Sequence, residues 1–296
     1  MTSGSLERCT RVVASSSAER EPGWRARLRE LGLTPSKALG QNFLHDYAIV
    51  RRIAESAGIG PEDTVLEVGP GLGILTEELA ARARRVVAVE LDVRLAAYLP
   101  TVLPTNVELV HADALEIDPV ALAGSDYLVV ANLPYSVGNA IVRRMLEAVP
   151  PPQTLTVMLQ REVAERIAAS PPEMSILAVG VQFYGTPRIL FRVGGGAFIP
   201  APRVESAVLR IETQPPPLPP AEHTAFFRVV QSGFAQRRKQ LGNTLSSGLF
   251  IERPAIAAAL TRAGIAPTER AERLTVADWV RVYQALRDAG YSLEGR

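Results

Sequence analysis

The sequence predicts an α/β fold, in which a parallel sheet carries helices on both faces, followed by a small all-α C-terminal domain. Between Thr64 and Gln160, short β-branched runs alternate with helix-like stretches, and this alternation is typical of parallel sheets covered on both faces. The proline-rich stretch 215–220 indicates a stiff, extended connector. Beyond it, apolar residues recur at helical spacing, which predicts the second domain.

The elements can be placed in chain order. β-branched runs predict strands at Thr64–Val68, Arg85–Glu90, Val107–Val110, Tyr127–Ala131, Thr154–Leu159 and Val204–Ile211. Helical spacing predicts helices at Ile74–Ala83, Val93–Leu99, Asn139–Ala148, His223–Phe234, Lys239–Ser246, Pro254–Ala263 and Val276–Ala289. The predicted boundaries are a disordered extension over residues 1–23, an α/β domain over 24–212, a proline-rich linker over 213–221 and a helical domain over 222–296.

Composition excludes several classes of protein. The 296 residues are 47% hydrophobic with a formal net charge of +1, so charge alone points neither to a nucleic acid nor to a membrane. A single cysteine, Cys9, excludes a disulfide framework and a thiolate-rich metal site. No apolar run approaches the roughly 18 residues that span a bilayer, and acids in the Arg- and Ser-rich start argue against a transit peptide. We expect a cytoplasmic monomer without a metal ion.

Chemically useful residues follow three successive strands, where the carboxyl ends of a parallel sheet hold ligands. Glu67–Gly73 is a glycine-rich turn from strand to helix, Glu90 ends the next strand, and Asp113 follows the third. A carboxylate at Glu90 can accept both hydroxyls of a ribose, and Asp113 can accept the amine of an adenine. The turn has no basic residue for a pyrophosphate, so the set favours S-adenosylmethionine. The Gly-x-Gly-x-Gly spacing fits dinucleotides less well, although a plain tight turn stays open.

The fourth strand ends in Asn132-Leu133-Pro134-Tyr135. An adenine N6 amine is a poor nucleophile because its lone pair is delocalised into the ring. Two acceptors near its N–H groups, the Asn132 side chain and a backbone carbonyl, would favour a lone pair turned towards an electrophilic methyl. Pro134 restricts its own φ and the conformation of Leu133, and Tyr135 offers a face on which a flipped base can stack.

Five stretches together resemble the small-subunit (16S) ribosomal RNA adenine N6-dimethyltransferases. They are Leu39–Leu44, Glu67–Gly73, Asn132–Tyr135, Phe198–Val208 and Phe234–Leu245, which lie within a resemblance that spans about residues 34–290. The resemblance implies a Rossmann-like class I S-adenosylmethionine-dependent methyltransferase sheet that closes with an antiparallel strand at Val204–Ile211. It also implies dimethylation of two adjacent adenosines near the 3′ end of the small-subunit RNA during ribosome biogenesis.

The same resemblance implies the site residues. S-adenosylmethionine is expected to contact Asn42, Leu44, Gly69, Gly71, Glu90, Leu91, Asp113, Ala114 and Asn132. The target adenine is expected at Asn132, Leu133, Pro134 and Tyr135. One departure is the segment Ala169–Ser175, which is shorter than the family pattern, so no RNA contact is carried over to it.

The expected partner is small-subunit rRNA within a partly assembled 30S subunit, held by basic residues. Arg237, Arg238 and Lys239 lie where a helix meets a turn, and Arg143 and Arg144 follow the Asn132 loop. A basic triplet alone is usually a solvated surface, but phosphate contact is favoured beside an adenine pocket, where it fixes position without reading sequence. Arg161 and Arg166 extend the same expected surface.

Three other functions compete. A resistance-type methyltransferase of large-subunit rRNA shares the cofactor site and the Asn-x-Pro-aromatic loop, but Phe198–Val208 and Phe234–Leu245 fit the small-subunit branch better. A mainly non-catalytic assembly factor is disfavoured by the intact Asn132–Tyr135 motif. A dehydrogenase is disfavoured by the turn spacing and because the histidines, His45, His111 and His223, lie in no recognisable proton-relay setting.

Overall fold

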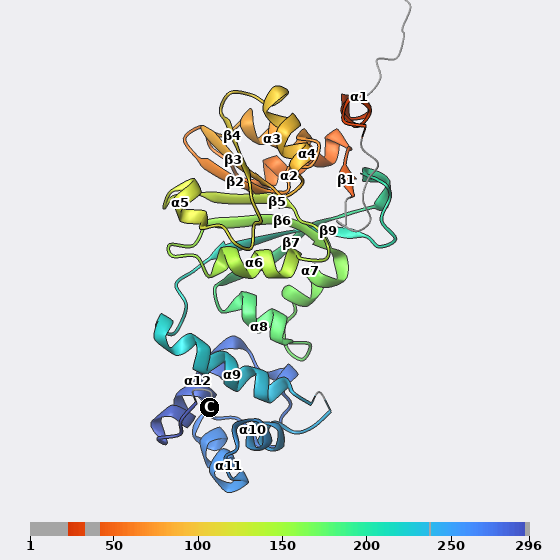
Figure 1. The fold of residues 1–296 in the computed structure, drawn as a ribbon. Coiled ribbons are helices and arrows are strands. Elements are labelled where there is room, and N and C mark those ends of the chain that lie inside the picture. The colour runs from red at the N-terminus through yellow and green to blue at the C-terminus, as the bar shows by residue number, and fades with distance from the viewer. Residues whose placement is uncertain (1–22, 33–41, 237, 294–296) are drawn as a thin grey trace, which may run out of the picture.

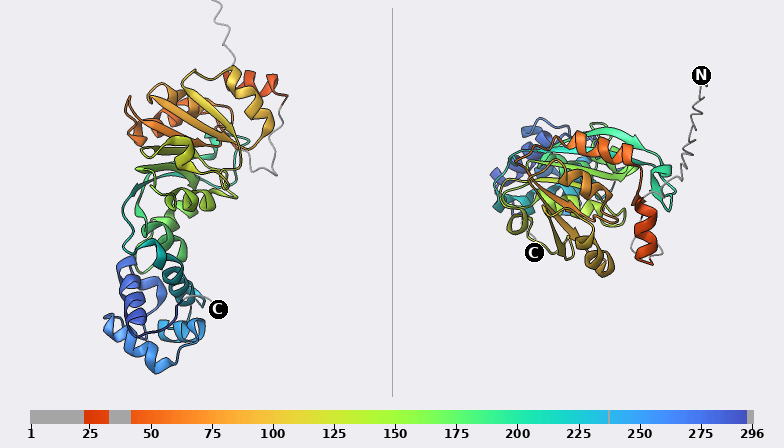
Figure 2. Two further views of the ribbon diagram at one scale, coloured as in Figure 1. Left: turned by 60° about the vertical axis from the view of Figure 1, so that its left-hand side comes forward. Right: turned by 90° about the horizontal axis from the view of Figure 1, so that it is seen from above.

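The computed structural model describes residues 23–32, 42–236 and 238–293. Most of the predicted extension (residues 1–22), the Leu39–Gln41 part of the first motif, and Arg237 lie outside these ranges. A sheet domain and a helical unit lie end to end (Figure 1), and the left view of Figure 2 shows the same elongated arrangement from a second direction. Among the described residues, no helix is both long and apolar enough to span a membrane.

Seven described strands form the central sheet in the order β4-β3-β2-β5-β6-β9-β7. Their bounds are β2 Thr64–Val68, β3 Arg85–Glu90, β4 Val107–His111, β5 Leu128–Asn132, β6 Thr154–Gln160, β7 Gly185–Val193 and β9 Ser206–Thr213. Strands β2 to β6 are parallel, while β9 lies antiparallel between β6 and β7. All six predicted strands are confirmed to within two residues, including the antiparallel closing strand. The edge strand β7 was not predicted.

Helices cover both faces of this sheet, as predicted. The described helices are α1 Gly23–Glu30, α2 Tyr47–Ala57, α3 Ile74–Ala80, α4 Val93–Tyr98, α5 Pro119–Ala123, α6 Gly138–Leu146, α7 Arg161–Ile167, α8 Ile176–Gln182, α9 His223–Phe234, α10 Leu241–Leu249, α11 Arg253–Arg262 and α12 Val276–Asp288. Successive strand residues point to opposite faces, so the core divides into two clusters. Val65 and Val86 pack with α2, α3 and α4, whereas Leu66 and Val87 pack with α6 and α8.

A short second ladder holds the segment that precedes α2. Strand β1 (Phe43–Leu44) pairs antiparallel with β8 (Phe198–Ile199), so that Phe43 lies opposite Ile199 and Leu44 opposite Phe198. Phe43, Leu44 and Phe198 are buried in the same cluster as the α2 side of the sheet. Two of the stretches that carried the family resemblance therefore meet in space, although about 155 residues separate them in sequence.

The helical unit packs against α8, so the proline-rich linker is not its sole attachment. Phe183 at the end of α8 stacks on Phe226 of α9 with ring centroids 4.7 Å apart, and Phe227 lies edge-on to Phe183 at 5.1 Å. The Ala169–Ser175 segment also reaches this unit, because the Met174 amide donates to the Glu272 carbonyl at 3.0 Å. The buried aromatic contacts join the cores of the two parts.

Candidate active site

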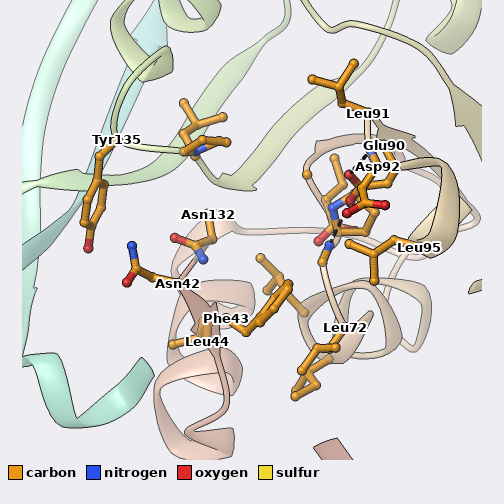
Figure 3. A pocket seen from close by; sticks show the side chains of 18 of the residues that line it. Asn42, Phe43, Leu44, Leu72, Glu90, Leu91, Asp92, Leu95, Asn132 and Tyr135 are labelled. Atoms are coloured by element: carbon orange, nitrogen blue, oxygen red, sulfur yellow. Dashed lines mark hydrogen bonds between the residues drawn. The ribbon is translucent and has the colours of Figure 1, made fainter. Parts of the chain in front are cut away.

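A cavity of about 310 Å³ opens at the carboxyl ends of β2, β3 and β5 (Figure 3). It is lined by Asn42, Phe43, Leu44, Glu67, Gly69, Pro70, Gly71, Leu72, Ile74, Leu75, Glu90, Leu91, Asp92, Leu95, Asn132, Leu133, Pro134, Tyr135, Ser136 and Val137. Figure 3 places Asn42, Asn132 and Tyr135 on one side of it, and Glu90, Asp92 and Leu95 on the other. Its volume is at the lower end of the range for small-molecule sites.

The glycine-rich turn forms the floor of the cavity. Gly69, Gly71 and Gly73 all have positive φ, at 70°, 57° and 78°, a conformation that residues with a β-carbon rarely adopt. A β-carbon on Gly71 would lie 3.1 Å from the Phe43 ring, so the β1 segment packs directly on the turn. The turn is therefore shaped for close approach of a ligand to the backbone.

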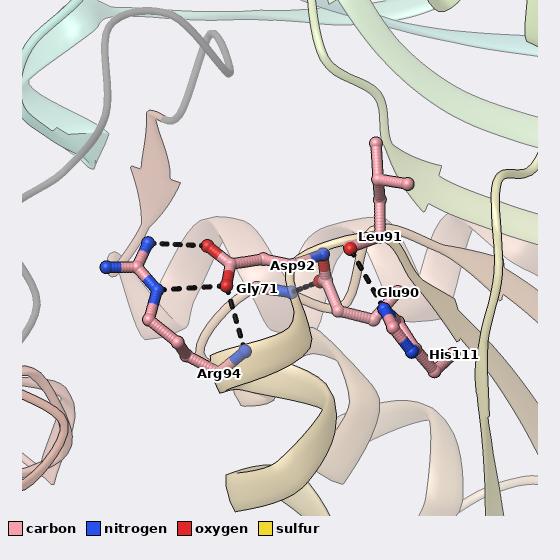
Figure 4. A network of polar contacts seen from close by, with 6 residues as sticks. All are labelled: Gly71, Glu90, Leu91, Asp92, Arg94 and His111. Carbon is pink, nitrogen blue, oxygen red and sulfur yellow. Dashed lines mark hydrogen bonds and ion pairs between the residues drawn. The ribbon is translucent and has the colours of Figure 1, made fainter.

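Glu90 is fixed by backbone donors at the end of β3 (Figure 4). Its Oε1 accepts from the Asp92 amide at 2.9 Å and its Oε2 from the Gly71 amide at 3.3 Å. Burial raises the pKa of Glu90, while these two backbone hydrogen bonds lower it. Asp92 is itself buried and pairs with Arg94 at 2.7 Å, with its carboxylate capping α4. Both oxygens of Glu90 are thus held in place and keep lone pairs for further donors.

Glu67 is the most deeply buried carboxyl of the cavity wall. It is 1% exposed, and its Oε2 accepts no hydrogen bond from any described residue. Burial raises the pKa of Glu67 to about 8; the Thr76 hydroxyl lowers it and Glu90 raises it further. A buried acceptor without a donor is costly, so this oxygen indicates a place for a donor or cation supplied by a ligand.

The Asn132 loop turns directly off β5 beside the glycine-rich turn. A β-carbon on Gly69 would lie 4.0 Å from both the Asn132 carbonyl oxygen and Pro134 Cδ, so the two loops are close neighbours. The Pro134 carbonyl accepts from the Gly138 amide at 2.9 Å and starts α6. The Tyr135 hydroxyl lies 2.5 Å from Ser206 Oγ of β9. These contacts fix the backbone of the loop and the hydroxyl end of Tyr135, and both Asn132 and Tyr135 line the cavity.

Comparison with known proteins decides the family. Residues 33–288 of this chain match the model of the ribosomal RNA adenine dimethylase family. The chain belongs to the ribosomal RNA adenine dimethylase family. It is similar to the "Ribosomal RNA small subunit methyltransferase A" of Dehalococcoides mccartyi (strain CBDB1), with 42% identity covering 84% of this chain and 88% of that protein. The protein of the same name from Pelotomaculum thermopropionicum is 40% identical over 94% of this chain and 99% of its own length.

Solved structures agree on the fold. The 23S rRNA methyltransferase ErmE superposes with a TM-score of 0.68 and 32% identity, covering 83% of this chain and all of that one. A dimethyladenosine transferase from Plasmodium falciparum also gives a TM-score of 0.68, at 21% identity, over 82% of this chain and 97% of that one. The sheet domain accordingly has the class I methyltransferase fold predicted from the sequence.

Most residues expected at the site meet in the cavity of this family member. Asn42, Leu44, Gly69, Gly71, Glu90, Leu91, Asn132, Leu133, Pro134 and Tyr135 all line it. Asp113 and Ala114 do not: the Asp113 carboxylate accepts from the Leu115 amide at 2.8 Å within its own turn. This turn still borders the Glu90 strand end, because the Ala112 amide donates to the Glu90 carbonyl at 3.1 Å.

Two acids of the cavity, Glu67 and Asp92, were not among the expected site residues. Glu67 is the first residue of the glycine-rich motif, and Asp92 lies two residues after Glu90. Their closeness in sequence to predicted site residues could have indicated that they also line the cavity. With Glu90 they give the lining three carboxyls, and none of its described residues is Lys, Arg or His. This set of acceptors fits S-adenosylmethionine, whose sulfonium and amino groups are positive, whereas a pyrophosphate would find no cation here.

The expected RNA-binding residues fall into two groups. Arg238 and Lys239 are exposed in the turn between α9 and α10, where a phosphate can reach them. In α6, Arg143 pairs with Glu147 at 2.7 Å, and Arg144 is half-buried and donates to the Ile117 carbonyl at 2.5 Å. Arg144 thus supports the loop after β4, which sequence reasoning did not anticipate.

Proposed function

We propose that this protein transfers methyl groups from S-adenosylmethionine to N6 of two adjacent adenosines near the 3′ end of small-subunit rRNA, giving N6,N6-dimethyladenosines. One observation carries the proposal: the Asn132–Tyr135 loop and the Glu90 strand end line the same cavity. A carboxylate suited to a ribose and an amide suited to an adenine amine thus lie on either side of one space (Figure 3). The family membership supports the same chemistry.

Binding of S-adenosylmethionine would use the wall formed by the turn and the β3 end. Glu90 would accept the ribose hydroxyls, Gly69 and Gly71 would let the backbone approach, and Asn42 and Leu44 would lie over the bound molecule. Leu91 would pack against the adenine, and Asp113 and Ala114 would meet its edge from the neighbouring turn. When bound, S-adenosylmethionine supplies an electrophilic methyl group.

The loop after β5 would activate the target amine. The Asn132 Oδ1 and a backbone carbonyl would accept its two N–H groups; because the Pro134 carbonyl already accepts the Gly138 and Val137 amides, we assign this carbonyl to Leu133. Tyr135 would stack on the base. The N6 lone pair would then form the N–C bond as the S–C bond breaks, and the methylated amine would lose its proton to water without a dedicated base.

The protein would act as a monomer in the cytoplasm. Its partner would be rRNA within a partly assembled 30S subunit. Arg237, Arg238 and Lys239 would contact phosphates from the helical unit, and Arg143 would add to this surface beside the cavity. The two relatives named as small-subunit methyltransferases are 40–42% identical to this chain, whereas the 23S rRNA methyltransferase ErmE is 32% identical. The higher identity favours small-subunit rRNA as the substrate. The likeness to ErmE keeps large-subunit rRNA as the second candidate substrate.

Transfer of tritiated methyl groups tests this proposal. Unmethylated small and large subunits are offered side by side with labelled S-adenosylmethionine, and nuclease digestion maps the label. We expect label on N6 of two adjacent adenosines of the small subunit. Label confined to the large subunit would move the protein to the other branch, and tight subunit binding without label would make it an assembly factor.

A further inference from the structure

We propose that Ser206 is a positioning residue, which holds the ring of Tyr135 in the orientation that stacks on the target base. The proposal rests on the function proposed above and deepens it. The proposal is based on the hydrogen bond between the two hydroxyls, in which Tyr135 Oη lies 2.5 Å from Ser206 Oγ. Tyr135 lines the cavity, whereas Ser206 does not, so Ser206 acts on the site through the tyrosine.

Ser206 is a rigid anchor. It is the first residue of β9 and is 0% exposed. On one side its backbone is in register with Gln160 of β6, and on the other with Val193 of β7. The backbone of Ser206 therefore moves only with the sheet, and because the residue is fully buried its hydroxyl has little space to move away from its hydrogen-bond partner.

Tyr135 needs such an anchor because its own loop fixes only its backbone. Its χ2 torsion is broad, as for all aromatic side chains, and the loop contacts that involve Pro134 do not touch the ring. The Tyr135 phenol is half-buried; burial raises its pKa and the Ser206 hydrogen bond lowers it. Without Ser206 the hydroxyl would lose a partner in a partly desolvated place, and the ring would turn to find water.

The arrangement also links two distant motifs. Tyr135 belongs to the Asn132–Tyr135 motif, and Ser206 lies in the Phe198–Val208 stretch, 71 residues further along the chain. The backbone of the residue before Ser206 is fixed too, because the Glu205 carbonyl accepts the Arg161 amide at 2.8 Å. The start of β9 is therefore tied to α7 as well as to the flanking strands.

A double-mutant cycle tests the proposal on the full-length protein. Ser206→Ala, Tyr135→Phe and the double variant are compared by single-turnover methyl transfer to unmethylated small subunits. A net hydrogen bond of typical strength predicts that each single variant is about 3- to 10-fold slower. Because both changes remove the same contact, we expect the double variant to be no slower than the slower single one.

Three further readouts distinguish positioning from support of the fold. KM for subunits and the affinity for S-adenosylmethionine should stay within about twofold of wild type, and the loss should lie in the rate of transfer. Thr156→Val is the matched control: Thr156 is 0% exposed in the adjacent strand β6, and its hydroxyl has no partner among the described residues. This variant removes a buried hydroxyl of the same sheet and should transfer methyl at the wild-type rate.

Each outcome decides the question. If the losses of the two single variants multiply, the double variant transfers methyl about 10- to 100-fold more slowly than wild type. This result would show that Ser206 acts independently of Tyr135, and it would overturn the proposal while the proposed function stands. An equal loss in Thr156→Val, or weaker cofactor binding in Ser206→Ala, would assign Ser206 to the fold and also overturn it. No transfer by the wild-type protein would overturn both.

Discussion

Of the three buried acids that line the cavity, Glu67 and Glu90 differ most clearly in their environments. Glu90 accepts two backbone amides, which offset part of the cost of its charge, whereas Oε2 of Glu67 has no donor among the described residues. Burial is the largest cause of a raised pKa in both. Glu90 is therefore a prepared acceptor for ribose hydroxyls, and Glu67 is a carboxyl held in its protonated form until a cation approaches.

Replacing Glu90 tests the first assignment. Glu90→Ala deletes both oxygens expected to accept the ribose, and hydrogen bonds to a charged group contribute about 1.5–3 kcal/mol each. We expect S-adenosylmethionine affinity to fall by about 100-fold or more in calorimetry. Glu108→Ala, which removes an exposed acid of the neighbouring strand β4, should bind like wild type, and unchanged affinity in Glu90→Ala would rule out the ribose contact.

Replacing Glu67 predicts a change in how stability depends on pH. With its pKa raised from 4.5 to about 8, the folded protein keeps a proton that the unfolded chain releases, so the free energy of unfolding falls as pH rises between these values. Glu67→Gln removes this pH dependence. The free energy of unfolding of the variant should be about 3 kcal/mol higher than that of wild type at pH 8 and equal to it near pH 5. Urea denaturation across this range is the measurement; parallel curves would contradict the raised pKa.

Among the elements, α10 ends in an unusual way. Its C-cap Phe250 has φ +58° and is 89% exposed, so a bulky side chain occupies a left-handed position without burying its ring. Glycine is the usual residue there because it has no β-carbon to strain the backbone. The following Ile251 is buried, so the left-handed turn serves the core while the phenylalanine ring contributes no burial.

Phe250→Gly should accordingly stabilise the protein. Relief of the backbone strain stabilises the folded state, and the greater conformational entropy that glycine gives the unfolded chain opposes this. The net gain in the free energy of unfolding is about 0.5–1 kcal/mol. Chemical denaturation measures it, with Phe250→Ala as the control that keeps a β-carbon and should show no gain. A destabilised Phe250→Gly would mean that the ring packs in solution.

Elements with regular patterns were predictable, and those shaped by tertiary context were not. The buried strands β2, β3, β5 and β6 are runs of apolar residues bounded by turns. Strand β7 contains Pro187, and its Arg188 and Arg192 are exposed at the sheet edge, so neither alternation nor a continuous apolar run marks it. Pairing of β1 with β8 depends on segments about 155 residues apart, which no local pattern reveals.

The site shows the same division. Strand-end residues such as Glu90 and Asn132 were predictable because parallel strands place their carboxyl ends on one rim. The side-chain partners were not: Arg144 turned inward to the Ile117 carbonyl, and Asp113 is engaged within its own turn. Charge type alone does not distinguish a residue that meets a ligand from one that supports a loop.

For the whole molecule, the helical unit sets how RNA can approach. It is joined to the sheet domain by buried aromatic rings, including the Phe183–Phe226 stack, and carries exposed Arg238 and Lys239. A basic turn on a firmly docked unit can fix the register of a large RNA relative to the cavity. We therefore expect RNA affinity and cofactor affinity to be separable.

Arg238→Ala with Lys239→Ala tests this separation. Loss of two phosphate contacts should reduce the slope of log affinity against log salt concentration by about 2 for RNA binding, with S-adenosylmethionine affinity unchanged. The matched control is Arg270→Ala with Arg273→Ala, which removes the same charge from arginines paired with Glu272 and Glu269. Equal effects of both pairs would indicate a response to net charge alone.

We expect the Asn132 loop to perform the chemistry on the adenine amine. Single-turnover methyl transfer by Asn132→Ala, measured with saturating small subunits and S-adenosylmethionine, tests this role. Loss of one preorganised acceptor predicts a rate reduced by about 100-fold or more, with RNA affinity within about threefold of wild type. Weakened RNA binding together with an unchanged rate of transfer would instead make Asn132 a docking residue and rule out its role in activating the amine.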